Sequence, residues 1–262
     1  QPESSAASDV YKRQGANLAE MSNMEIPVPP GFTITTEVCN YFTENKKLPN
    51  SLDNEIRQAV SKLENLSDKS FGGEGTPLLL SVRSGGRVSM PGMMDSILNI
   101  GLNDSNVFQL AEAFNDERFA LDSYRRLIQM YSNVVLGVEH ERFEAVLANK
   151  KRMDNVVSDA DFNVDQLNWI INAYKNTVER FTDSLFPQEP YEQLTGAIEA
   201  VFNSWQNKRA ATYRKINNIP DSWGTGATIQ TMVFGNLNDK SGTGVAFTRN
   251  PSNGDKELYG EY

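Results

Sequence analysis

A long helical block between two strand-forming regions is the feature that most constrains this fold. From Ser105 to about Lys215 the chain has few glycines and carries apolar residues at helical spacing. Because short strand-like runs precede and follow the block, we predict an α+β fold, with mostly antiparallel sheet elements and a large inserted helical subdomain. The helical segments of the block are Glu117–Leu136, His140–Asn149, Asp165–Phe181 and Tyr191–Tyr213.

The strand-like runs lie on both sides of this block. Leu78–Val82 is a short apolar run, as expected of a buried strand, and a second apolar run follows the turn-rich piece after it. Beyond the block, 227–234 alternates and is followed by a short run at 245–248. The loop 235–244 is rich in glycine, serine and threonine, so we predict that these two runs form a hairpin. Residues 257–262 begin a further strand.

The N-terminal third is predicted to be mostly helical. Residues 1–14 are rich in serine and alanine without periodicity, and we expect them to be a leader outside the fold. Helices are expected at Ala16–Met24, at Thr33–Phe42 with Thr35 or Thr36 as the N-cap, and at Leu52–Leu66.

Composition excludes several classes of protein. The net charge of −9 argues against nucleic acid as the main partner. The single cysteine, Cys39, excludes an internal disulfide and a thiolate metal site, and we expect it to be buried. No apolar run approaches the ~18 residues of a membrane span, and the N-terminus lacks a signal-peptide pattern. We therefore expect a cytoplasmic protein without a membrane partner.

Two arginines stand close together after the first strand. Arg83 and Arg87 surround Ser84-Gly85-Gly86. A guanidinium fork matches phosphate oxygens, and glycines let backbone N–H groups approach a ligand. This pattern favours polyphosphate binding, and the alternative is a surface loop that carries two arginines. The loop 235–244 is a weaker candidate, because it lacks the spacing of a Walker A motif.

Other candidate residues are interpreted as structural. His140 is the only histidine, and it stands at a helix start without a partnering aspartate or serine motif. We expect no catalytic role for it. The aromatic residues of the helical block are expected to form its core: Trp169, Tyr174, Phe202 and Trp205.

Three segments resemble one enzyme family. VRSGGRVSMPGMMDSILNIGL at Val82–Leu102, SGTGVAFTRNP at Ser241–Pro251 and GANLAEM from Gly15 are similar to the corresponding segments of pyruvate phosphate dikinases. The resemblance runs from Gly15 to Tyr262. Phosphoenolpyruvate synthase has a different sequence in the segment that corresponds to Val82–Leu102, so the match favours pyruvate phosphate dikinase.

The resemblance implies an ATP-grasp domain and a set of nucleotide contacts. Arg83 and Arg87 would hold ATP phosphates, with Arg83 catalytic. Met232 and Val233 would lie beside the adenine, and the family's phosphate-binding lysine would stand at Gln14. Backbone groups of Gly242, Thr243 and Gly244 would cover the phosphates. Mg²⁺ is implied as the cofactor, with its ligands mostly beyond Tyr262, so no metal ligand is assigned within the chain.

The resemblance also implies a reaction and partners. In this family an ATP-grasp domain phosphorylates a histidine of a swivelling domain, and a barrel domain transfers the phosphoryl group to pyruvate. The chain corresponds to most of the first part, so its partners would be ATP and the phosphohistidine domain of the same full-length homodimeric protein. The implied division is 15–104 for the first subdomain, 105–215 for the helical insertion and 216–262 for the start of a second nucleotide-binding subdomain.

Three alternatives stay open. One is another dikinase, such as phosphoenolpyruvate synthase or a glucan dikinase. The sequence SMPGMMDS argues against both. A second is a nucleotide-binding module without catalysis. A third is a remnant that has no activity by itself.

Overall fold

The computed structural model describes residues 13–88, 90, 92–238 and 240–262. They form two units, one extending to Met232 and one comprising Val233–Tyr262, and each is described by itself. The predicted leader falls mainly on residues 1–12, which lie outside the described residues. Its last two positions, Arg13 and Gln14, belong to the helix α2 (Arg13–Asn23).

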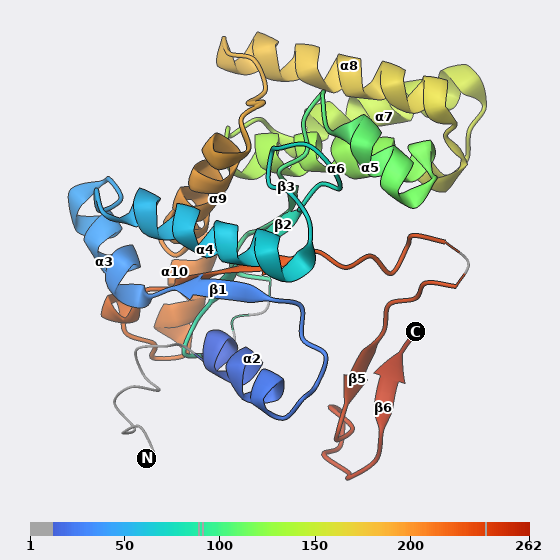
Figure 1. Cartoon of the computed structure of the whole chain (residues 1–262). Coiled ribbons are helices and arrows are strands. Elements are labelled where there is room, and N and C mark those ends of the chain that lie inside the picture. The colour runs from blue at the N-terminus through green and yellow to red at the C-terminus, as the bar shows by residue number, and fades with distance from the viewer. Residues whose placement is uncertain (1–12, 89, 91, 239) are drawn as a thin grey trace. The chain divides into compact units, whose positions relative to one another are not determined.

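A four-stranded antiparallel sheet lies at the centre of the first unit (Figure 1). Its strands run in the order β1-β4-β2-β3, and all three pairings are antiparallel. This arrangement confirms the predicted mixture of helices and antiparallel sheet. The strands are β1 (Gly31–Ile34), β2 (Leu80–Gly85), β3 (Ser96–Ile100) and β4 (Gly226–Thr231).

The strand register separates an apolar face of the sheet from a polar one. Ile229 is paired with Phe32 on one side and with Val82 on the other, and Val82 is paired with Ile97. Directly paired residues of antiparallel strands point to the same face, so these four side chains form one apolar row. Ile229, Val82 and Ile97 are fully buried, and the helix α9 (Pro190–Ser204) packs against β2, β3 and β4.

Two further helices precede the second strand. They are α3 (Thr36–Asn45) and α4 (Leu52–Ser67), which confirms both predicted helices. The first of them starts later than expected, because Thr33 and Ile34 belong to β1. Thr35 is its N-cap with extended backbone, although its side chain makes no capping hydrogen bond. Cys39 is buried as predicted.

The helical block is present, with well-defined helix starts. The Asp116 carboxylate accepts a hydrogen bond from the Phe119 N–H at 2.8 Å, and Asn163 forms a capping box with Gln166. Besides α9, the block contains α5 (Val107–Phe114), α6 (Glu117–Val134), α7 (His140–Asp154), α8 (Val164–Thr182) and α10 (Lys208–Ile216). Two 3-10 turns are η1 (Asp159–Asp161) and η2 (Asp221–Trp223).

Two predictions for this block were wrong. The expected single helix Tyr191–Tyr213 is broken between α9 and α10, where the Trp205 indole N–H donates to the Asp221 carbonyl at 3.0 Å and holds the chain in a bend. Trp169 is 40% exposed, with the Lys150 ammonium 4.9 Å from its ring centre, so it lies outside the core. The other three aromatic residues, Tyr174, Phe202 and Trp205, are buried as predicted.

The second unit contains a small antiparallel pair, β5 (Val245–Phe247) and β6 (Tyr259–Glu261). Phe247 is paired with Tyr259 in this ladder. The predicted hairpin between the runs at 227–234 and 245–248 was wrong. Both edges of β4 are already occupied, one by β1 and the other by β2, so the run at 245–248 pairs with β6 instead.

We expect the chain to lose stability at alkaline pH. Burial raises the pKa of Tyr174 to about 12 and also raises the pKa values of Tyr124 and Tyr131. An unfolded tyrosine titrates near pH 10, so this stabilisation is complete below pH ~10 and is lost as the pH rises through the folded pKa. Chemical unfolding at pH 8 to 11.5, with phenolate absorbance recorded in parallel, measures this loss of unfolding free energy. A constant free energy of unfolding across this range would contradict the expectation.

None of the helices in the described part of the chain combines the length and the hydropathy that a membrane span requires.

Candidate functional site

Arg83 lies on the polar face of the sheet, in a row with two threonines. Thr228 of β4 is paired with Thr33 of β1 on one side and with Arg83 of β2 on the other. The threonine hydroxyls lie 3.2 Å apart and share a hydrogen bond. Paired side chains of antiparallel strands are about 5 Å apart at Cβ, so the Arg83 stem adjoins Thr228. Sequence reasoning placed Arg83 on a loop, whereas it belongs to β2.

The first turn of α2 lies against the same row. A Cβ atom added to Gly15 would lie 2.7 Å from the Thr33 hydroxyl, so glycine is needed for this close approach. The first turn of this helix contains no acidic residue. The N–H groups at the start of a helix carry partial positive charge, and the nearby guanidinium of Arg83 adds a full one. Arg83 is exposed, and among the described residues its guanidinium makes no hydrogen bond or ion pair. The site therefore offers positive charge to an anion.

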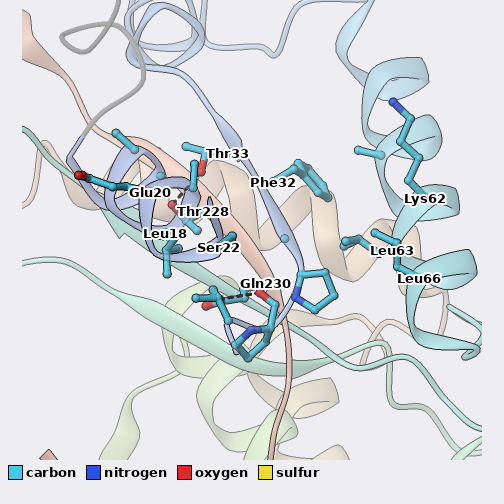
Figure 2. Close-up of a pocket in the computed structure, with 18 of the residues that line it drawn as sticks. Leu18, Glu20, Ser22, Phe32, Thr33, Lys62, Leu63, Leu66, Thr228 and Gln230 are labelled. Carbon is cyan, nitrogen blue, oxygen red and sulfur yellow. Dashed lines mark hydrogen bonds between the residues drawn. The ribbon is translucent and has the colours of Figure 1, made fainter. Parts of the chain in front are cut away.

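A pocket adjoins this row at the edge strand β1. It has a volume of about 850 Å³ and is lined by residues of α2, β1, α4 and β4. Figure 2 shows Thr33 and Thr228 at one end and Phe32, Leu63 and Lys62 at the other. Neither predicted arginine is among its lining residues. Thr228 is nevertheless shared between the pocket and the row that contains Arg83.

Arg87 lies beyond the end of β2 and contacts a different part of the unit. Its guanidinium carbon is 5.3 Å from the ring centre of Trp223, which belongs to η2. The side chain is half-buried, and its Nε atom is buried without a hydrogen-bond acceptor among the described residues. The structure thus places the two predicted arginines in different surroundings, Arg83 in the sheet and Arg87 on an aromatic ring.

The residues predicted to lie beside the adenine follow β4. The Met232 N–H donates to the Leu79 carbonyl at 2.9 Å, which extends the pairing of the strand by one step, and its side chain is half-buried. Val233 is 70% exposed and begins the second unit.

The predicted phosphate loop belongs to the second unit. A Cβ atom on Gly242 would lie 2.8 Å from the Tyr262 ring, and one on Gly244 would lie 2.9 Å from the Glu261 carbonyl oxygen. Glycine is therefore required at Gly244, which packs against backbone, whereas Gly242 packs against the exposed side chain of Tyr262. Thr243 lies between them and is exposed.

Sequence reasoning missed Thr33 and Thr228. Each was assigned to a helix or strand by pattern, but neither was considered as a site residue. The alternation of Thr228 with the apolar Ile229 was a usable signal, because it places Thr228 on the face opposite the core. Its partners Thr33 and Arg83 are distant in the sequence, so the row itself required the sheet order.

No acidic cluster that would hold a metal ion is found. Within the described part of the chain, no group of three histidine, cysteine, aspartate or glutamate residues is placed so that it could hold a metal ion. The described residues therefore do not fit a Mg²⁺ site of their own. His140 pairs with Glu144, with 3.4 Å between its Nε2 and the carboxylate oxygen, on an exposed part of α7.

Comparison with known proteins gives a consistent result. Residues 14–70 and 44–260 match the family described as pyruvate phosphate dikinase, AMP/ATP-binding domain. The chain is 52% identical over 250 residues to a pyruvate, phosphate dikinase of Rhizobium meliloti, covering 95% of this chain and 28% of the relative. It is 50% identical over 251 residues to that of Clostridium symbiosum, covering 95% and 29%.

A plant relative is similar to the same extent. The chloroplastic pyruvate, phosphate dikinase 1 of Arabidopsis thaliana is 49% identical over 250 residues, covering 95% of this chain and 26% of the relative. The chain thus spans between a quarter and a third of the length of these relatives. Because the family match covers nearly the whole chain, this protein belongs to the family of pyruvate phosphate dikinase AMP/ATP-binding domains.

Proposed function

We propose that this chain is the ATP-binding portion of a pyruvate phosphate dikinase. The proposal rests on the position of Arg83. This residue lies on the polar face of the sheet in a row with Thr33 and Thr228. The first turn of α2 packs against this row at Thr33. The family membership of the chain and its similarity to pyruvate phosphate dikinases support the choice of nucleotide and of enzyme.

In this proposal the positive groups of the first unit bind the triphosphate. The N–H groups of the first turn of α2 donate to phosphate oxygens, as helix N-termini do in other nucleotide sites. The Arg83 guanidinium binds the same group and offsets the charge that develops during phosphoryl transfer. Met232 and Val233 are proposed adenine contacts, and Gly242, Thr243 and Gly244 proposed phosphate contacts. Arg87 is a second phosphate ligand.

The full reaction is proposed for a longer protein that contains this chain. ATP would phosphorylate a histidine of a swivelling domain, so that pyruvate, ATP and phosphate interconvert with phosphoenolpyruvate, AMP and diphosphate. Mg²⁺, the phosphohistidine domain and a homodimeric, cytoplasmic assembly belong to the same proposal. The chain alone would bind ATP without turnover. The relatives described above are pyruvate phosphate dikinases, which supports this enzyme over phosphoenolpyruvate synthase.

Calorimetric titration of the chain with Mg-ATP tests the proposal. Because a hydrogen bond to a charged group contributes about 1.5–3 kcal/mol, we expect Arg83→Ala to weaken ATP binding about tenfold or more. Arg126→Ala is the matched control, because Arg126 is an exposed arginine on α6 in the helical block. No binding by the unaltered chain, or equal affinities of the two variants, would contradict the proposal.

We expect Gln14→Lys to strengthen ATP binding. Gln14 lies in the first turn of α2, where the family resemblance places a phosphate-binding lysine. A new ammonium–phosphate contact there should raise the affinity about tenfold. Asn172→Lys adds the same charge on the exposed surface of α8 and should leave the affinity within about twofold. Equal gains in both variants would indicate a general charge effect and contradict the placement.

A further inference from the structure

We propose that Trp223 is a positioning residue, which holds the Arg87 guanidinium in place for a phosphate of the bound nucleotide. The inference deepens the proposed function and rests on it. It starts from one unusual feature, a buried guanidinium nitrogen that has no acceptor.

The Nε atom of Arg87 is buried and has no hydrogen-bond partner among the described residues. A buried N–H of a charged group without an acceptor is costly, and such groups in folded proteins are almost always satisfied by protein, water or a bound ion. The guanidinium lies over the Trp223 ring, with its central carbon 5.3 Å from the ring centre. The indole face stabilises the positive charge, but it accepts no conventional hydrogen bond. The ring therefore leaves the Nε–H of Arg87 without an acceptor, and a bound anion is one group that would supply it.

The strand register explains why these two residues meet. Gly85 of β2 is paired with Gly226 of β4, and this is the last pair of the ladder. In an antiparallel pair, residues beyond the end of one strand lie beside those that precede the other. Arg87 follows Gly85 by two positions and Trp223 precedes Gly226 by three, so both lie just outside the same end of the ladder.

Trp223 is attached to an anchored turn. Two contacts fix Asp221 of η2: its carbonyl accepts from the Trp205 indole N–H at 3.0 Å, and its carboxylate accepts from the Arg214 Nε at 2.7 Å. The next residue, Ser222, accepts at its carbonyl from the Asn40 amide at 3.0 Å. An indole on such a turn is a rigid surface for a flexible arginine side chain.

The residue that follows Trp223, Gly224, has a backbone conformation that favours glycine. Gly224 has a φ of +61°, and a Cβ atom there would lie 2.6 Å from the Asn40 side-chain oxygen. The backbone between Trp223 and β4 therefore has no space for a side chain at position 224. This fixed path keeps the indole at the end of the β2–β4 ladder. A guanidinium held there loses less conformational entropy when it binds phosphate than a free one does.

A double-mutant cycle on Mg-ATP affinity, measured by calorimetry on the chain, tests this role. Trp223→Leu removes the aromatic face and should weaken binding about three- to tenfold. Trp223→Phe keeps an aromatic face and should restore most of the affinity. In an Arg87→Ala background, Trp223→Leu should cause no further loss, because its effect depends on the arginine. Trp169→Leu, at a partly exposed tryptophan of α8, is the matched control and should bind as the unaltered chain does.

The outcomes separate the inference from the proposed function. Absence of Mg-ATP binding by the unaltered chain would overturn the proposed function and this inference together. Binding that Trp223→Leu leaves unchanged would overturn the inference alone. An equal loss from Trp223→Leu with and without Arg87 would also overturn it, because a general disturbance of the fold acts independently of the arginine. Circular dichroism and the unfolding midpoint of each variant provide the check on folding.

Discussion

Arg83→Ala should abolish ATP-dependent phosphorylation of the histidine in a full-length pyruvate phosphate dikinase that contains this chain, while the fold stays intact. The expected loss is large because the guanidinium would bind the triphosphate and also stabilise the transferring group. The fold should tolerate the change, since the side chain is exposed and makes no hydrogen bond or ion pair with the other described residues. Incorporation of labelled phosphate from ATP, together with thermal unfolding, measures both effects.

Two variants serve as controls for this experiment. Arg126→Ala removes an exposed arginine of α6 and should retain phosphorylation. Arg83→Lys keeps a positive charge without the planar fork, so it should retain a small part of the activity. Normal phosphorylation of Arg83→Ala would show that this residue is not part of the phosphoryl-transfer site.

Gln193→Leu should destabilise the first unit by about 3 kcal/mol or more. Gln193 of α9 is fully buried, and its amide makes three hydrogen bonds to the main chain. It accepts from the Gly101 N–H at 2.9 Å and donates to the carbonyls of Leu102 and Pro187, each at 2.9 Å. A leucine of similar size would leave the Gly101 N–H and the Leu102 carbonyl buried without partners and the half-buried Pro187 carbonyl without this donor, and each buried group costs about 1–3 kcal/mol. Denaturant unfolding measures the loss.

Gln206→Leu is the control for this stability prediction. Gln206 is exposed just after α9, so its replacement should change the free energy of unfolding by less than about 0.5 kcal/mol. Similar stability of the two variants would contradict the role assigned to the buried amide.

Local features of the fold were predictable from the sequence. The helix α4 has apolar residues at helical spacing and begins at the predicted Leu52, and α6 begins at the predicted Glu117 after a capping aspartate. These boundaries depend on neighbouring residues, which a single sequence displays. The break between α9 and α10 was not predictable in this way, because it depends on a contact of Trp205 with the distant Asp221.

The sheet and the site depend on contacts between distant segments. β4 lies between β1 and β2, which belong to the N-terminal third of the chain, and no local pattern indicates this order. The row of Thr33, Thr228 and Arg83 exists only because of that order. The arginines themselves were recognisable, because two guanidinium groups around glycines form a local pattern. Their different environments, one in the strand and one on Trp223, were not.

The division into subdomains at 15–104, 105–215 and 216–262 stays a prediction. In the structure, β4 joins the same sheet as the N-terminal strands, whereas Val233–Tyr262 forms a separate unit. The proposed site residues Gly242, Thr243 and Gly244 belong to that second unit.

Amide hydrogen exchange of the chain with and without Mg-ATP is the most direct test of the central claim, that the triphosphate binds at Arg83 and the first turn of α2. The first N–H groups of a helix have no intrahelical acceptor and exchange rapidly unless a ligand binds them. We predict that ATP slows exchange in the first turn of α2 and in 83–88, while α7 and α8 remain unchanged. Protection confined to other segments, with no change in the first turn of α2 or in 83–88, would contradict the account.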